Sequence, residues 1–445
     1  MVQEKKNYLL PIIVMIFLFG MVSFVTNLAS PMGDILKHQF KVPNWMGTLG
    51  VFANFIAYAV MGYPAGNLLQ KLGYKKTALI AIAIGFVGVG IQTLSGTFES
   101  FGVYLLGAFI AGFSMCLLNT VVNPMLNSLG MKIATGDQEK KEKKASQLLQ
   151  AGGSFNSLAG TAVIILTGIL IPEIAKAKIS DVFPLMYAAL AIFAFAFIVI
   201  ALTAIPENKR DAQVTSDKSQ YGPLSFRHFI LGAVGIFVYV GVEVGIPNVL
   251  NKWLQNHDLN VLQLHGAGNA EAIAGSVAAT YWFLMLIGRL IGAAIGGKVS
   301  AKSMLIVASA VGFILTIIAM YAPTSALIDM PVFKNAPDGL FGLASIPVNA
   351  ALLVLLGLCT SVMWGAVFNL AVAGLGRYVE KGAGIFMVMV CGGGILPLLQ
   401  NGIVDLTDNG VGYLVSYWVV VVGFGYLLYY ALAGCKNVNK DVPVE

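Results

Sequence analysis

The sequence predicts an all-α polytopic membrane protein whose twelve transmembrane helices form two pseudo-symmetric six-helix bundles. Three observations predict this fold: 58% of the 445 residues are hydrophobic, only 11% are charged, and long apolar runs recur from end to end. Soluble domains carry about 25% charged residues. Each apolar run is long enough to cross roughly 30 Å of hydrocarbon as a helix. The runs are continuous rather than alternating, which favours helices over barrel strands.

The apolar runs give the twelve elements in order. Their predicted bounds are 8–36, 46–70, 77–97, 101–129, 146–171, 182–205, 229–250, 271–297, 303–322, 347–375, 382–404 and 411–434. The longest polar joins between them are Gly130–Ala145, Pro206–His228, Asn251–Ala270 and Pro323–Ile346. The first run follows two lysines, but its apolar core is longer than that of a secretory signal. We therefore expect it to be an uncleaved first span.

The distribution of Lys and Arg predicts the orientation. If both termini are cytoplasmic, the outward joins hold six of the 27 basic residues, and the other 21 lie on the cytoplasmic side. Cytoplasmic loops of membrane proteins carry an excess of basic residues. We therefore expect both termini inside. The same rule explains the net charge of +6 without a nucleic-acid partner.

The join Pro206–His228 lies near the middle of the chain and is the most polar stretch between spans. It predicts an N-terminal six-helix bundle of residues 1–205, a cytoplasmic linker of residues 206–228, and a C-terminal bundle with a short cytoplasmic tail over residues 229–445.

Internal similarity supports this division. The stretch 123–130 recurs 246 positions later as 369–376. Four residues recur 226 positions later, pairing Gly62, Gly66, Lys76 and Leu79 with Gly288, Gly292, Lys302 and Leu305. Parallel repeats of this kind place a substrate site at their interface, near the bilayer midplane.

The join between the second and third spans reads GNLLQKLGYKK over residues 66–76. It resembles the loop signature of the major facilitator superfamily, G-x-x-x-D-[RK]-x-G-[RK]-[RK], with Gln70 in place of the aspartate. Glycine allows a tight turn, and basic side chains can meet helix C-terminal ends and hold a cytoplasmic gate shut. The resemblance implies a gating loop with Gly66, Lys71, Gly73, Lys75 and Lys76.

Longer strings resemble the fucose–proton symporter family, which also holds glucose/galactose and amino-sugar carriers. They include YVGVEVGIPNVLNKWL, TYWFLMLIGRLIG and NLAVAGLGRYVEKGAGIFMVMVCGGGILPLLQ. This resemblance covers most of the chain. It implies a secondary transporter in a bacterial inner membrane that imports a monosaccharide by alternating access, driven by a cation gradient.

Glu243 is the first candidate for proton or cation coupling. It lies in the middle of the predicted span 229–250. A charged group there costs about 2.5–3.5 kcal/mol by insertion scales, so it is a functional hypothesis by default. Burial favours the neutral form of a carboxyl group, which suits a proton that binds on one side and leaves on the other. The alternative is a protonated glutamate that bonds a neighbouring helix.

Asp34 is the second coupling candidate, because its GDIL string resembles the NDIL string of the fucose carriers. Pro31 is expected to break the preceding helix, and Lys37 lies within reach as an ion-pair partner. Asp34 could therefore instead be a solvated residue at the outer mouth. Fucose carriers have a glutamate where this chain has Asn119, which makes fucose itself a weaker expectation.

Amide and aromatic side chains inside the spans are the candidates for substrate binding. Sugars are recognised by convergent amide hydrogen bonds and by aromatic faces against the ring. The candidate substrate-binding residues are Asn119, Asn123, Gln150, Asn156, Asn248, Tyr281, Trp282, Trp364 and Asn369. The alternative for any one amide is that it joins neighbouring helices.

Several classes of function are disfavoured. The sequence has no phosphate-binding G-x-x-x-x-G-K-[ST] loop, no His/Cys metal spacing, and only four Arg, none of which is expected at mid-span. We expect no enzyme activity, cofactor or metal, and a monomeric chain in a lipid bilayer whose partners are a monosaccharide and H⁺ or Na⁺. An uncoupled sugar facilitator, a Na⁺-coupled symporter and a multidrug exporter of the same fold remain as alternatives, with a sensor or channel as the remote case.

Overall fold

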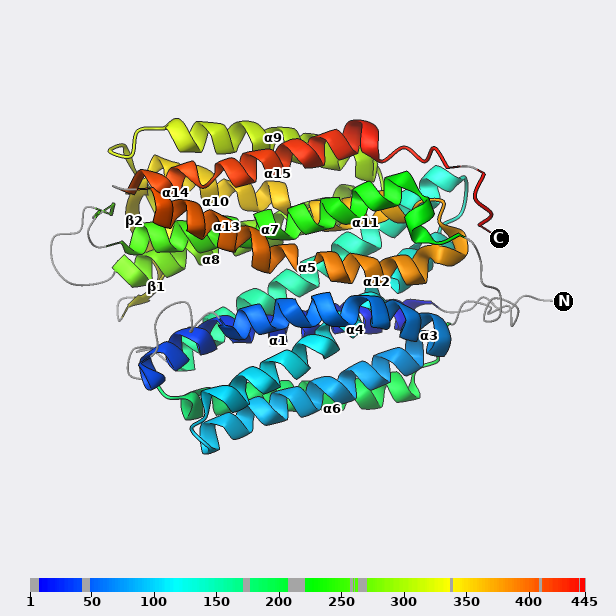
Figure 1. Cartoon of the computed structure of the whole chain (residues 1–445), viewed down its shortest axis with the longest axis horizontal. Coiled ribbons are helices and arrows are strands. Elements are labelled where there is room, and N and C mark those ends of the chain that lie inside the picture. The colour runs from blue at the N-terminus through cyan, green and yellow to red at the C-terminus, as the bar shows by residue number, and fades with distance from the viewer. Residues whose placement is uncertain are drawn as a thin grey trace.

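The computed structural model describes residues 8–41, 49–170, 177–206, 221–256, 259, 261–262, 270–336, 339–407, 410–439 and 441–444. Within these ranges the side chains at 29–31, 33–34, 36–38, 164–165, 168–169, 270–272, 332–336 and 339–341 are not described. The helices lie side by side in two groups, with α5 and α12 where the groups meet (Figure 1).

The first group contains the helices of the N-terminal part of the chain. They are α1 (Leu9–Phe40), α3 (Leu49–Thr97), α4 (Phe101–Ile133), α5 (Gln138–Leu170) and α6 (Phe183–Leu202), with the 3-10 turn η2 (Ile179–Val182) before α6. A straight helix of 49 residues, the length of α3, would be about 73 Å long, more than twice the hydrocarbon thickness. Gly73 divides α3 into two crossings, because its backbone leaves the helical region at φ 82° and ψ 178°.

The second group begins with the 3-10 turn η4 (Pro223–Ser225). Its helices are α7 (Arg227–Gln255), α8 (Ala270–Ile295), α9 (Ala301–Tyr321), the pair α10 (Val348–Thr360) and α11 (Met363–Val372), the turn η5 (Gly376–Tyr378), the pair α12 (Val379–Met389) and α13 (Gly392–Leu406), and the series α14 (Val411–Val415), α15 (Trp418–Tyr429) and η7 (Tyr430–Gly434). Each pair or series occupies one predicted span.

The predicted number of crossings agrees with the structure. In the described part of the chain, ten helical segments are long and apolar enough to span a membrane. One of these, α3, is long enough to cross twice, and the 33-residue helix α5 adds a further crossing, which makes twelve. The first helix begins and the last helix ends at the same end of the molecule (Figure 1). We call this end the terminal face and the opposite end the hairpin face.

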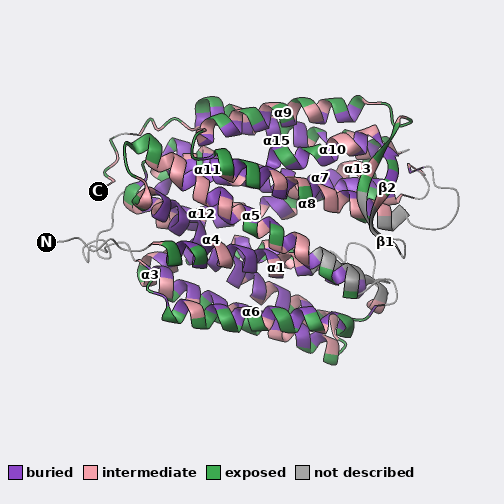
Figure 2. Ribbon diagram, turned by 180° about the vertical axis from the view of Figure 1, so that it is seen from behind, coloured by how far each residue is buried: buried purple, intermediate pink, exposed green. Residues whose placement is uncertain are grey.

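The outer surfaces of the bundles are apolar. Figure 2 shows exposed residues along the outside of α6 and α9. They include large hydrophobic side chains such as Phe195 and Ile198 on α6 and Val307 and Ile318 on α9. Helices that expose such residues over their whole length face hydrocarbon rather than water.

One detail of the predicted elements was wrong, and one element was not predicted. The helix α1 continues through Pro31 to Phe40, so this proline does not break it. The predicted polar join Pro323–Ile346 contains most of an antiparallel hairpin of β1 (Leu327–Ala336) and β2 (Gly339–Pro347). Only Pro347, the last residue of this hairpin, belongs to a predicted span.

The loop at the turn of α3 is fixed within the first group. Lys75 donates from Nζ to the carbonyl oxygens of Ala201 (2.7 Å) and Thr203 (2.9 Å), at the C-terminal end of α6. The last carbonyls of a helix have no intrahelical partner and attract a cation. A basic residue of the predicted gating loop therefore does meet a helix C-terminal end, and that end belongs to the same group of helices.

The two groups meet through glycines where α3 crosses α12. A Cβ atom added to Gly384 would lie 2.7 Å from both the nitrogen and the Cα of Gly66, and one on Gly66 would lie 3.0 Å from the Cα of Gly384. Small residues of this kind let two helix backbones approach closely inside a membrane. The repeat partner of Gly66 is Gly292 on α8, which faces Gln150 of α5 at the second contact between the groups.

Replacing Gly384 with Val is expected to lower the stability of the folded protein by about 1–3 kcal/mol, the usual cost of overpacking. The added carbons would meet the backbone of α3, which cannot move as a flexible side chain can. The midpoint of thermal unfolding in detergent measures the effect. Gly90→Val on α3 is the control, because no atom lies within 4 Å of a Cβ there. Equal small shifts in the two variants would contradict the tight contact.

Candidate functional site

The centre of the candidate site is an ion pair between two transmembrane helices. Glu243 lies at the middle of α7, and its side chain is only 13% exposed. Arg289 of α8 donates from Nη2 to its Oε1 atom at 3.0 Å, with a side chain that is 9% exposed. Two desolvated charges this close neutralise one another, and removal of either one would leave the other buried and uncompensated.

Arg289 corrects the sequence reading, which expected no arginine at mid-span and counted this residue among the 21 on the cytoplasmic side. It lies six residues before the end of α8, about 9 Å along the helix axis. The charged partner of Glu243 therefore lies on the next helix.

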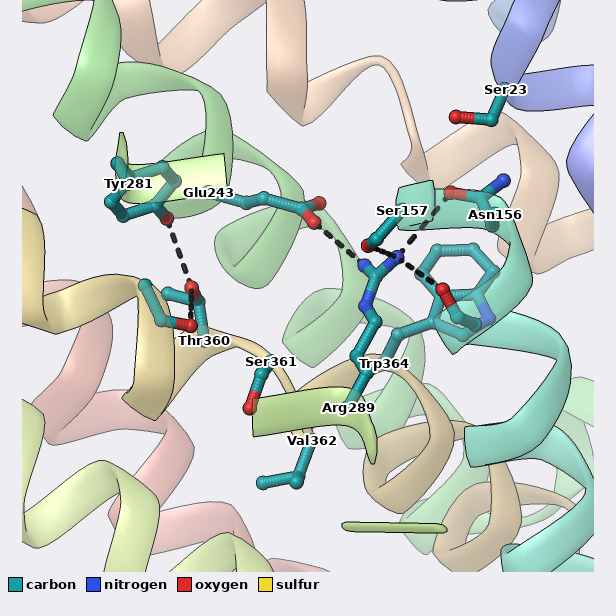
Figure 3. A network of polar contacts seen from close by, with 12 residues as sticks. Ser23, Asn156, Ser157, Glu243, Tyr281, Arg289, Thr360, Ser361, Val362 and Trp364 are labelled. Atoms are coloured by element: carbon teal, nitrogen blue, oxygen red, sulfur yellow. Dashed lines mark hydrogen bonds and ion pairs between the residues drawn. The ribbon is translucent and has the colours of Figure 1, made fainter. Parts of the chain in front are cut away.

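The same guanidinium reaches across to the first group of helices. Nη1 of Arg289 donates to three acceptors of α5: the carbonyl oxygen of Gly153 (3.0 Å), Oδ1 of Asn156 (3.3 Å) and Oγ of Ser157 (2.7 Å). Figure 3 shows Arg289 between Glu243 on one side and Asn156 and Ser157 on the other. One cation thus joins α5, α7 and α8.

Small residues on α5 make room for this contact. A Cβ atom on Gly153 would lie 3.4 Å from Cδ of Arg289, so the arginine stem rests on bare helix backbone. A planar guanidinium with five donors can serve several acceptors at once, which a lysine cannot do in the same geometry. The sequence GGSFNS of residues 152–157 therefore supplies both the space and the acceptors.

A second set of contacts joins α4 and α11, towards the terminal face. Trp364 donates from its indole Nε1 to Oδ1 of Asn123 at 2.8 Å. About one turn further along, Asn127 donates from Nδ2 to Oδ1 of Asn369 at 2.7 Å, and Asn369 donates to the carbonyl oxygen of Glu142 at 3.2 Å. These hydrogen bonds join the two groups of helices through the predicted substrate-binding residues Asn123, Trp364 and Asn369.

Two further candidate amides lie near this interface. Gln150 donates from Nε2 to the carbonyl oxygen of Val362 at 2.9 Å, where α10 gives way to α11. Asn119 donates to the hydroxyl of Tyr58 at 2.8 Å and stays within the first group of helices. Asn156 likewise donates to the carbonyl oxygen of Phe19 on α1 while it accepts from Arg289.

Three other candidates make contacts within the second group of helices. Tyr281 is fully buried, and its hydroxyl lies 2.9 Å from Oγ1 of Thr360 within the second group. The ring of Trp282 meets that of Tyr281 edge to face, with centroids 5.4 Å apart. Asn248 lies further along α7 towards the hairpin face and accepts from Asn401 of α13 at 3.1 Å.

The remaining candidates are the second coupling residue, two lysines of the predicted gating loop and possible metal ligands. Asp34 belongs to α1, but its side chain lies outside the described residues. Lys71 and Lys76 of the predicted gating loop are both exposed, beside the Gly73 turn. In the described part of the chain, no three His, Cys, Asp or Glu side chains gather closely enough to hold a metal ion.

The sequence reading missed Arg289 and Ser157 as members of the site. Charge balance could have found the first, because Arg289 falls inside a predicted span and a membrane-embedded charge requires an opposite one. Ser157 carries no such signal, since hydroxyls are also common as contacts between transmembrane helices. Which of the candidate residues bind a ligand stays a prediction.

Comparison with known proteins supports the fold and identifies relatives. The sequence profile described as Major Facilitator Superfamily matches residues 12–397. The glucose/galactose transporter of Brucella abortus biovar 1 (strain 9-941) is 27% identical over 440 residues, 98% of this chain and 96% of that protein. The L-fucose-proton symporter of Escherichia coli (strain K12) is 20% identical over 435 residues, 91% of this chain and 89% of that one.

A solved structure matches over almost the whole chain. It is the crystal structure of the Major Facilitator Superfamily transporter FucP in the outward conformation, with a TM-score of 0.75 and 18% sequence identity. The match covers 95% of this chain and 98% of that one. At this identity the likeness concerns the fold alone, with its two groups of membrane-spanning helices.

Proposed function

Because this chain belongs to the major facilitator superfamily, we propose that it is a secondary transporter that imports a monosaccharide, a hexose or an amino sugar, together with H⁺. Membership makes it a polytopic membrane protein and a transporter rather than an enzyme. The sugar, the proton and the direction are the parts that we propose.

The names of the relatives support a sugar as substrate. Glucose/galactose transporters from two genera align with 94% or more of this chain, and the fucose–proton symporters align with about nine-tenths of it. The middle of the molecule is also rich in amides that meet between the two groups of helices. When the groups separate, these amides become free to bond the hydroxyls of a sugar. A multidrug exporter, whose cavity is apolar, would not need such amides.

The observation that carries the coupling proposal is the position of Glu243. It is a buried carboxylate whose partner, Arg289, is bound at the same time to the opposite group of helices. Protonation of Glu243 would cancel the ion pair and leave Arg289 with neutral acceptors only. The proton on Glu243 and the contact between α5 and α8 must therefore affect one another, because linkage between two equilibria is reciprocal.

We further propose that the terminal face is cytoplasmic, as the count of basic residues predicts. The hydrogen bonds that join the groups, such as Asn127 to Asn369 and Arg289 to Ser157, lie in the middle of the molecule and towards the terminal face. Under this orientation the structure is closed to the cytoplasm. A bacterial inner membrane is the location that the relatives favour.

Uptake by proteoliposomes tests the function. The purified protein is given labelled glucose, galactose, N-acetylglucosamine and fucose, with and without an inward proton gradient, and with Na⁺ present or absent. Accumulation of a hexose or amino sugar only with the proton gradient is the expected result. Equilibration without accumulation would identify an uncoupled facilitator, and accumulation driven only by Na⁺ would replace the proton. No uptake of any sugar would overturn the proposal.

A further inference from the structure

The C-terminal segment folds back along the terminal face of the second group of helices. We call its described residues, 435–439 and 441–444, the strap. Figure 1 shows it leaving the last helix and running along this face. Val442 and Val444 are partly buried and pack against the hydrophobic core. Because its valines pack on the core, the strap is an ordered part of the fold.

The strap is attached first to the start of α7. This helix has no capping side chain of its own, since its N-cap residue is Phe226. Asn439 of the strap supplies the missing acceptor, and its Oδ1 accepts from the backbone nitrogen of Arg227 at 2.9 Å. The first amides of a helix lack intrahelical partners, and an asparagine oxygen is among the preferred caps.

The second attachment is to the turn between α11 and α12. The backbone nitrogen of Arg377 donates to the carbonyl oxygen of Val444 at 3.3 Å. Gly376 has φ +52°, and a Cβ atom there would collide with that carbonyl group. Gly374 has φ +74°, and a Cβ atom there would lie 2.9 Å from the side-chain nitrogen of Asn437. Both glycines adopt left-handed backbone that other residues disfavour.

The internal repeat shows that this turn is specific to the second half. Gly130, the repeat partner of Gly376, lies inside α4, which continues to Ile133. In the second half α11 already ends at Val372, and the left-handed glycines follow. The two halves of the repeat thus differ at the place where the strap binds.

The helix that follows this turn is α12, a segment of only 11 residues. Its other end is also interrupted, because α13 begins as a separate helix at Gly392. Near the start of α12, the carbonyl oxygens of Glu380 and Lys381 would lie 3.3 and 3.2 Å from a Cβ on Gly66 of α3. A short helix between a glycine turn and a break therefore forms one of the contacts between the two groups.

We propose that the strap is a positioning element that makes α12 move together with α7. It connects the start of α7, the helix that carries Glu243, with the turn that leads into α12, the helix that packs on α3. With the strap bound, α12 separates from α3 only when α7 moves as well. The strap thereby ties opening of the terminal face to the proton step, an inference that rests on the proposed function.

Loss of the strap is expected to uncouple the two helices rather than to unfold the protein. A glycine turn without its bound segment regains backbone freedom, and α12 can then leave α3 while α7 stays in place. Sugar would cross without its proton. Accumulation should fall several-fold, while exchange of labelled for unlabelled sugar across the membrane should persist or become faster.

The experiment compares a chain that ends at Cys435 with the full chain in two assays. Proteoliposomes give the ratio of gradient-driven accumulation to exchange. Hydrogen–deuterium exchange gives the protection of the amides in α12 (Val379–Met389) and in the middle of α7. We expect a lower ratio and faster amide exchange in α12, with the middle of α7 unchanged.

Point variants separate the strap from a general loss of stability. Asn439→Ala should reproduce part of the truncation, and Asn439→Asp should restore full-chain behaviour because it keeps an acceptor oxygen. Gly376→Ala should act like the truncation in the full chain, beyond the backbone strain that an alanine brings to any left-handed position. Gly136→Ala is the matched control, since it introduces an alanine at φ +118° in a turn of the first half, where the nearest atom is the flexible Lys140 side chain.

The outcomes distinguish this inference from the proposed function. Unchanged accumulation and unchanged exchange of the α12 amides in the truncated chain would overturn the role of the strap. Faster amide exchange throughout the molecule would also overturn it, in favour of a role in folding alone. If the full chain carries no sugar, the proposed function fails, and the amide exchange of α12 still decides whether the strap holds that helix.

Discussion

Replacing Glu243 with Gln is expected to abolish gradient-driven accumulation of the sugar while leaving exchange largely intact. A membrane potential of about 100 mV supplies about 2.3 kcal/mol per proton, which corresponds to roughly fiftyfold accumulation. Glutamine keeps the size of the side chain and an oxygen that can accept from Arg289, but it cannot bind or release a proton. The accumulation ratio should therefore fall to about one.

Proteoliposomes with a proton gradient measure accumulation, and labelled-sugar counterflow without a gradient measures exchange. Glu139→Gln is the matched control, because the Glu139 side chain is 72% exposed and pairs with Lys143 at 2.7 Å, so its loss should leave both activities unchanged. If Glu243→Gln accumulates sugar to the level of the native protein, Glu243 is not the coupling residue. Asp34 would then be the next residue to test.

Replacing Arg289 with Met is expected to destabilise the protein by about 3–5 kcal/mol, because it leaves the carboxylate of Glu243 buried without a partner. The double variant Glu243→Gln/Arg289→Met removes both charges and should regain most of that loss. Two substitutions that are individually harmful and jointly tolerated are the signature of a coupled pair. Unfolding in detergent at constant pH measures all three proteins.

Lys143→Met provides the control for these three variants, since its pair with the exposed Glu139 is expected to contribute about 0–1 kcal/mol. Equal destabilisation in the single and double variants would show that the contacts of Arg289 with α5, rather than its charge pair with Glu243, dominate. Arg289→Lys should have a stability between those of the native protein and Arg289→Met. Lysine keeps the positive charge but lacks the planar guanidinium that reaches Gly153, Asn156 and Ser157.

The helices could be predicted because membrane-spanning segments obey one strong rule, that of apolar length. The predicted bounds 101–129 and 229–250 lie within α4 and α7, and α4 extends further at its C-terminal end and α7 at both ends. Polar residues at those ends, such as Lys132 and Arg227, were assigned to loops, although a helix continues past the hydrocarbon wherever its backbone bonds can be made.

Breaks within a span could not be predicted from the same rule. The apolar run 382–404 contains the end of α12 and the start of α13, and it was predicted as one span. At this break α13 approaches α7, because a Cβ atom on Gly392 would collide with the backbone of Phe237. Such a close approach depends on which helix lies opposite, and one sequence does not contain that information.

The candidate site could be predicted as a set of residue types but not as a set of pairs. Glu243 was found because a carboxylate inside an apolar run is conspicuous. Its partner Arg289 bonds Asn156, which lies 133 positions before Arg289 in the sequence, and only the folded chain brings the two together. The bridges Trp364–Asn123 and Asn369–Asn127 likewise follow from the packing of α11 on α4.

The hydrogen bonds of Lys75 with the end of α6 have a consequence for the insertion of the chain into the membrane. While the second and third spans enter the membrane, α6 has not yet been synthesised, and the charge of Lys75 can act only on the direction of insertion. About 125 residues later along the chain, the carbonyl groups of Ala201 and Thr203 emerge, and the same ammonium group becomes their partner. Under the proposed orientation, the Lys75 side chain first directs the insertion of the two spans of α3. It later holds α6 against them through hydrogen bonds.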